Sequence, residues 1–99
     1  MVSVIIAFET GFSNDNVIGL IDNREIFQKR GLTTNPMLGY AGSVKVDIDV
    51  SAKDLAIIIP NKETSKKIPL KLPQITNIAI QLEGKNILYR FSEEPLGYL

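Results

Sequence analysis

The chain has 99 residues, which is one domain's worth, and eleven Lys and Arg residues balance eleven Asp and Glu residues, so the formal charge is zero. A neutral domain lacks the general electrostatic attraction to nucleic acid or to an anionic membrane. Cys and His are both absent, which excludes disulfides, thiolate and imidazole metal sites and the commonest nucleophile–base pairs. We therefore expect one domain over residues 1–99 that is not an enzyme, has no cofactor or metal ion, and binds neither nucleic acid nor membrane.

The composition favours β-structure. Fourteen Ile and six Val residues stand against five Ala, and four Phe, three Tyr and five Thr bring the β-preferring residues to thirty-two. Branched and aromatic side chains fit a pleated, half-buried surface better than a helix.

The first apolar run, residues 2–8, ends at Glu9 and has no basic residue before it. This pattern is typical of a first strand rather than a signal peptide. No stretch approaches the roughly 18 apolar residues of a membrane span. A cytoplasmic location is the default expectation, although an excised module of a secreted protein would have the same sequence features.

The remaining elements follow at short spacing. Asp22 and Asn23 form a tight-turn pair, because both tolerate a positive φ angle. Period-two alternation or a short apolar run predicts strands at 2–8, 17–21, 25–29, 44–50, 55–59, 68–72, 78–82 and 87–91. The pattern indicates an all-β, single-domain, immunoglobulin-like antiparallel β-sandwich of about seven strands.

The predicted core uses the inward-facing residue of each alternation: Val4, Ile6, Leu20, Phe27, Val46, Ile48, Leu55, Ile57, Ile68, Leu70, Ile78, Ile80, Ile87 and Tyr89. Pro69 cannot donate to a strand ladder, so its strand should be an edge. The first strand has neither Pro nor Lys, and we expect it to be the opposite, unguarded edge. Such an edge tends to pair with a second copy, which predicts a homodimer.

Acidic residues suggest one metal site. Asp47 and Asp49 project from the same face of a strand, and with Asp54 they could supply oxygen ligands for Ca²⁺. The favoured interpretation is a solvated strand face flanked by Lys45 and Lys53, and the sequence does not decide between the two. Residues 13–16 are rich in oxygen ligands but lack the spacing of an EF-hand, so a plain turn is expected there.

The irregular segment 30–42 and the C-terminal tail carry large apolar residues outside every predicted strand. We expect segment 30–42 to close one end of the sandwich, or, if exposed, to form an apolar recognition patch. The candidate partner-binding residues are Leu32, Met37, Leu38, Tyr40, Leu96 and Tyr98.

Residues 15–83 resemble the PEGA-type domain, a small β-sandwich. Residues 17–24 are similar to its hydrophobic strand and turn, although Asn23 replaces the turn glycine. Residues 33–36 resemble its Thr-Pro element, and the alternation from Val46 to Leu82 follows its later strands, without the family's Gly-His and Gly-Tyr signatures. A transthyretin-like sandwich fits nearly as well, and such folds carry many functions.

These observations favour a small non-catalytic interaction module or accessory structural domain that binds a protein partner. One alternative is a sandwich that binds carbohydrate or another small ligand through segment 30–42. A second alternative, a small hydrolase with a carboxylate pair, is disfavoured because every Asp and Glu falls in a turn or on a wet face.

Overall fold

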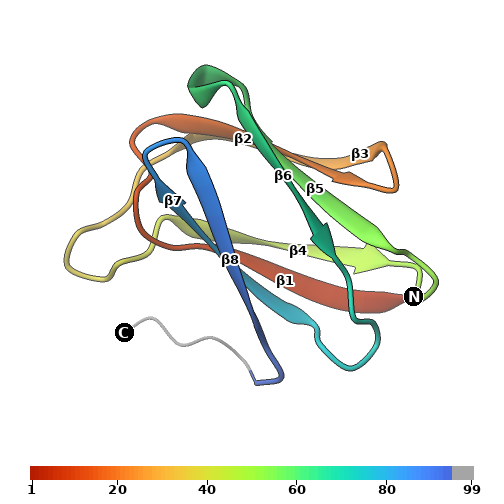
Figure 1. Ribbon diagram of the computed structural model, residues 1–99. Coiled ribbons are helices and arrows are strands. Elements are labelled where there is room, and N and C mark those ends of the chain that lie inside the picture. The colour runs from red at the N-terminus through yellow and green to blue at the C-terminus, as the bar shows by residue number, and fades with distance from the viewer. Residues whose placement is uncertain (95–99) are drawn as a thin grey trace.

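The computed structural model describes residues 1–94, and this part of the chain contains eight strands and one short 3-10 helix (Figure 1). In chain order they are β1 (Val2–Phe8), β2 (Asp15–Ile21), β3 (Arg24–Leu32), β4 (Gly42–Ile48), β5 (Asp54–Ile59), η1 (Pro60–Lys62), β6 (Thr64–Pro69), β7 (Asn77–Glu83) and β8 (Asn86–Ser92).

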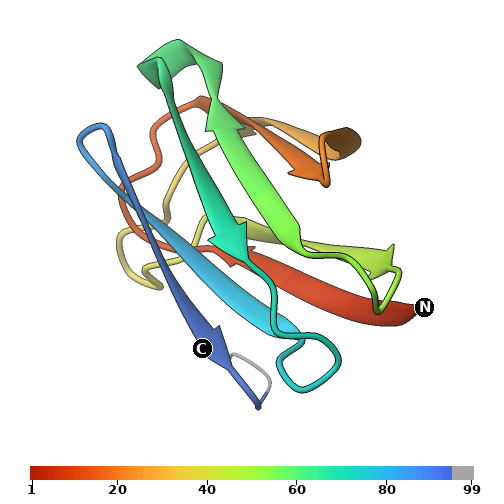
Figure 2. The same cartoon turned by 45° about the vertical axis from the view of Figure 1, so that its right-hand side comes forward.

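The strands form two four-stranded sheets that lie face to face (Figure 2). One sheet has the order β4-β1-β7-β8 and the other β3-β2-β5-β6. Neighbouring strands are antiparallel except β1 and β7, which are parallel from Ile5–Asn77 to Phe8–Ile80. The predicted all-β sandwich is confirmed, with eight strands rather than about seven.

Turn chemistry explains the hairpins. Asp22 and Asn23 have φ angles of 47° and 71° between β2 and β3, which is the left-handed region that Asp and Asn tolerate best after Gly. Gly84, with φ of 65°, makes the corresponding turn between β7 and β8.

The core fills the space between the sheets. Of the predicted core residues, Val4, Ile6, Phe27, Ile48, Leu55, Ile57, Ile68, Ile78, Ile80 and Ile87 are buried, while Val46, Leu70 and Tyr89 are partly buried against them. Three Phe rings pack edge to face at the centre of this core: Phe8 lies 5.7 Å from Phe12 and 6.1 Å from Phe27 between ring centroids. Phe8 and Phe12 were not among the predicted core residues.

The prediction for Leu20 was wrong. Val17 and Gly19 are the buried apolar positions of β2, and Leu20 lies on the other face, where it lines a surface pocket with Ala56 and Lys67. Residues 17–21 are apolar on both faces, so alternation cannot choose between them. A glycine fits at this inward-facing position of β2 because the Phe27 ring occupies the space that a side chain would take.

One of the two strands predicted to be edges is an edge, and the other is not. β6, which contains Pro69, is an outer strand as predicted, although it begins at Thr64 rather than near Ile68. β1 is not an edge, because it pairs with β4 on one side and β7 on the other. A homodimer through the first strand is therefore ruled out, since the ladder positions of β1 are already occupied.

Within residues 1–94, no helix is long and apolar enough to cross a membrane.

Candidate functional site

Segment 30–42 is shorter as a loop than the sequence indicates, because β3 continues to Leu32 and β4 begins at Gly42. Between these strands, Asn35 and Tyr40 form an isolated antiparallel bridge. The bridge closes a small loop, residues 35–40, which we call the tip. The tip projects from one end of the sandwich (Figure 1).

Asn35 organises the tip through both its main chain and its side chain. Its N–H donates to the carbonyl oxygen of Tyr40 at 2.9 Å, and its carbonyl oxygen accepts from Gly39 at 2.8 Å and from Leu38 at 3.2 Å. Its Oδ1 accepts from the N–H of Met37 at 2.9 Å, which is an Asx turn. Gly39 has a φ of 64°, a conformation that favours glycine. The tip is thus a hydrogen-bonded turn of defined shape.

The base of the tip is bound to the segment that follows β1. The hydroxyl of Thr34 donates to the carbonyl oxygen of Glu9 at 2.7 Å and accepts from the N–H of Phe12 at 3.0 Å. The N–H of Thr34 donates to Phe12, and that of Ala41 donates to Phe8 at 2.7 Å. These bonds fix the tip on the rigid sandwich.

The tip separates the predicted site residues into two groups. Leu32 is buried with 6% of its surface exposed, and Tyr40 is partly buried. Met37 is 92% exposed and Leu38 is 45% exposed. Closing the core and offering an apolar surface are therefore tasks of different residues in one loop. Leu96 and Tyr98 lie outside the described residues.

Comparison of the chain with protein-family models, with curated proteins and with solved structures finds no match.

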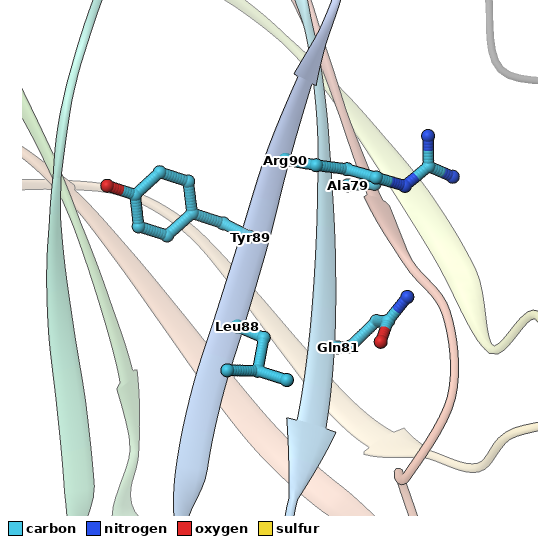
Figure 3. A pocket seen from close by; sticks show the side chains of 5 residues that line it. All are labelled: Ala79, Gln81, Leu88, Tyr89 and Arg90. Atoms are coloured by element: carbon cyan, nitrogen blue, oxygen red, sulfur yellow. The ribbon is translucent and has the colours of Figure 1, made fainter.

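A second candidate is a pocket of about 200 Å³ at the β4-β1-β7-β8 sheet, and the residues that line it are Ala79, Gln81, Leu88, Tyr89 and Arg90 (Figure 3). Arg90 Nη2 donates to the carboxylate of Glu9 at 2.7 Å, and Gln81 Nε2 donates to it at 3.2 Å. These polar groups are bound to each other. Tyr89 points to the opposite side of the sheet in Figure 3, so its ring offers no stacking platform for a sugar here.

The acidic residues proposed for Ca²⁺ do not converge. Asp47 accepts from the Ser3 hydroxyl at 2.8 Å, and Asp49 accepts from the N–H and hydroxyl of Ser51 at 2.9 and 2.7 Å. Those bonds lower the pKa of Asp49, the main-chain N–H contributing most. Asp54 lies on another sheet, and within residues 1–94 no group of three acidic side chains is placed to hold a metal ion.

One polar cluster was missed by sequence reasoning. Asp15 is fully buried, accepts from Asn61 Nδ2 at 2.6 Å and from the Ser13 N–H at 2.8 Å, and has Lys62 Nζ at 3.8 Å. The sequence placed Asp15 in a plain turn, and no local signal connects it with a residue 46 positions later. The cluster joins β2 to η1. Across the described part of the chain every buried side-chain donor or acceptor has a partner, so nothing in the cluster points to a ligand.

Proposed function

We propose that this chain is a non-catalytic interaction module whose tip binds a protein partner. The observation that carries the proposal is the 92% exposure of Met37 in a turn whose backbone is held by Asn35. A turn held in one conformation loses little conformational entropy when it binds, so its apolar side chains contribute more of their burial to affinity.

The chemistry of the tip favours a protein with an apolar pocket. Pro36, Met37 and Leu38 are consecutive and exposed, and together they form a small apolar knob rather than a single surface residue. Met is flexible and polarisable, which suits insertion into a partner's cavity. No charged side chain belongs to residues 35–40, which favours an apolar rather than an ionic contact.

The alternatives have less support. A carboxylate hydrolase needs two carboxyl groups facing one substrate, whereas the buried carboxylates Glu9 and Asp15 are each bound by donors of their own. A sugar-binding site needs an exposed aromatic platform, and the tip's aromatic residue, Tyr40, is partly buried. The PEGA-like or transthyretin-like relationship and the cytoplasmic location stay hypotheses from the sequence.

Photo-crosslinking tests the proposal in cells of the native host. A benzophenone amino acid at position 38 should give a protein adduct that the same amino acid at position 88 does not give. Position 88 is a matched control because Leu88 is 44% exposed, close to the 45% of Leu38, but lies on β8. The adduct is then identified by mass spectrometry and its protein purified.

Binding to that purified protein gives the quantitative result. Leu38→Ser should weaken affinity by about tenfold or more, as for a residue at the centre of an interface, while Leu88→Ser should change it less than about twofold. Equal losses in both variants, or the same adducts from both positions, would contradict a tip-centred interface.

A further inference from the structure

The two sheets have four outer strands among the described residues: β3, β4, β6 and β8. An outer strand presents unpaired N–H and C=O groups that can pair with another strand, and proteins usually guard such edges. Three of these four strands carry a guard against pairing with a second copy.

β6 and β3 are guarded in recognised ways. On β6, Pro69 lacks an N–H, and Lys66 and Lys67 bring like charges to any self-pairing. β3 pairs with β2 through two register shifts, and such bulges twist an edge away from a flat partner.

β8 is guarded by its neighbours in the opposite sheet. The hydroxyl of Thr64 donates to the carbonyl oxygen of Lys85 at 2.7 Å, and Lys71 lies 5.1 Å from the centre of the Phe91 ring. Lys66 of β6 lines the same surface pocket as Leu88. If a second copy paired along β8, Lys66 and Lys71 would come close to the same lysines of that copy, and their like charges would repel.

β4 has no such guard. It pairs with β1 over all seven residues with no register shift, contains no Pro, and carries one basic and one acidic side chain, Lys45 and Asp47. Its inward-facing residues Val44 and Val46 stay partly exposed. A pocket of about 200 Å³, which Ile26 of β3 and Ile48 of β4 help to line, shows that apolar surface is also accessible between these two strands.

The hydrogen-bond alternation shows which backbone groups of β4 face outward. On the β7 side of β1, the N–H groups of Ile5 and Glu9 donate at 2.8 Å to the carbonyl oxygens of Thr76 and Ile80. Odd-numbered residues of β1 therefore direct their backbone groups to β7, and even-numbered residues direct theirs to β4. Val46, which faces an even-numbered residue of β1, is thus in a hydrogen-bonded pair, and the outward-directed groups of β4 belong to residues 43, 45 and 47.

We propose that the free edge of β4 binds the β4 edge of a second copy of this chain, antiparallel and centred on Val46. In this register Lys45 of each copy faces Asp47 of the other, so two opposite-charge pairs form on the outer face. The outward backbone groups of Lys45 and Asp47 pair with one another across the two-fold axis. Val46 faces Val46, and Val44 faces Ile48, which covers apolar surface left open in one copy.

Charge pairing favours this register. If the two-fold axis passed through Lys45 instead, Lys45 of one copy would face Lys45 of the other. Such a like-charge pair disfavours pairing. The proposal is independent of the tip, so a Met37→Ser variant should still self-associate.

A charge exchange tests the pairing by sedimentation equilibrium at concentrations up to about 1 mM, where even weak association is populated. Lys45→Asp and Asp47→Lys should each weaken self-association by about tenfold or more, because both facing pairs become like-charged. An equimolar mixture of the two variants should restore it, since at both facing pairs an acidic side chain of one variant then meets a basic side chain of the other. The Lys45→Asp/Asp47→Lys double variant should also associate as the wild type does.

Cysteine crosslinking tests the register. Because the chain has no natural Cys, each single-Cys variant has one thiol per copy, and any disulfide must join the two introduced residues. Facing residues of a non-hydrogen-bonded pair have Cα atoms about 4.5 Å apart, within disulfide reach. Val46→Cys should therefore crosslink under mild oxidation. Val44→Cys is the matched control on the same strand and face, and should not crosslink, because its two copies would be offset by about 13 Å along the strand.

Three results would overturn the proposal. These are a wild-type protein that sediments as a monomer throughout, a mixture of the two charge variants that associates no better than either alone, and crosslinking that is faster for Lys45→Cys or Val44→Cys than for Val46→Cys. The mixture experiment remains decisive if the Val46→Cys variant does not fold, since both charge positions are exposed.

Discussion

The side-chain nitrogen of Asn61 lies 2.6 Å from a carboxylate oxygen of Asp15, and that carboxylate is completely buried. Asn61 also accepts from the N–H of Asn16 at 3.0 Å through its Oδ1. One side chain of η1 thereby joins two consecutive residues at the start of β2. The contact links segments 46 positions apart in the chain and ties η1 to the sheet.

Removing either partner of this contact should destabilise the fold. Asn61→Ala leaves the buried carboxylate without its shortest hydrogen bond, and Asp15→Ala removes the acceptor of the Asn61 side chain and of the Ser13 N–H. We expect each to lower the free energy of unfolding by about 2–4 kcal/mol. Urea denaturation measures the change, and Asn86→Ala, at an exposed Asn that begins β8, should change it by less than about 0.5 kcal/mol.

The double variant adds a further test. Asp15→Ala/Asn61→Ala should be less destabilised than the two single losses predict, by about 1–2 kcal/mol, because the hydrogen bond between the two side chains is counted in both single losses but is lost only once. Strictly additive losses would show that the two side chains do not act as a pair.

Gly19 provides a prediction about packing. A Cβ added at Gly19 would lie 2.0 Å from the Phe27 ring, which is itself buried. Gly19→Ala should therefore cost about 1–3 kcal/mol through overpacking. In a Phe27→Leu background the smaller side chain leaves room, so the same change should cost much less. Thermal or urea unfolding of the four proteins measures this, and an equal cost in both backgrounds would show that the ring is not what excludes a side chain.

Local patterns in the sequence predict most strands but not their partners. Val44, Val46 and Ile48 alternate with polar residues, and a strand is present there, although it runs from Gly42 to Ile48 rather than from 44 to 50. The position of β1 inside its sheet depends on a parallel pairing with β7, far later in the chain, which no local pattern encodes.

The sequence predicted where the candidate site lies, but not which of its residues are buried and which are exposed. Leu32, Met37, Leu38 and Tyr40 all stood out as apolar residues beyond any predicted strand. Which of them fold inward depends on β3 continuing to Leu32 and on the bridge between Asn35 and Tyr40. The first feature depends on the pairing of Leu32 with Asp15 of β2, and the base of the tip is held by the bonds of Thr34 to the segment after β1. Composition and spacing do not show these long-range contacts.

The difference in burial between Leu32 and Met37 gives a prediction on stability. Leu32→Ala should lower the free energy of unfolding by about 2–4 kcal/mol, because it removes a buried side chain and leaves a cavity. Met37→Ala should change it by less than about 0.5 kcal/mol, since a side chain 92% exposed loses almost no burial. Tyr40→Ala should fall between the two, since Tyr40 is partly buried. A large loss in Met37→Ala would mean that the tip closes the core and is not an exposed surface.

Asp49 gives a prediction on pH. Two hydrogen bonds from Ser51, the main-chain N–H first and the hydroxyl second, hold the pKa of Asp49 below its ordinary value. A folded-state pKa below the unfolded one means that the carboxylate stabilises the fold above the unfolded pKa, near 3.9 for a typical Asp. This contribution is lost as the pH falls through the folded-state pKa.

Ser51→Ala removes the hydroxyl and keeps the N–H, so the pKa of Asp49 should rise only part of the way to its ordinary value. Carboxyl NMR titration measures this directly, and Ser3→Ala, which removes a hydroxyl bound to Asp47 instead, is the control that should leave Asp49 unchanged. The difference in unfolding free energy between wild type and Ser51→Ala should be present at neutral pH and shrink on acidification. An Asp49 titration that is identical in the wild type and Ser51→Ala would show that the hydroxyl does not bind the carboxylate in solution.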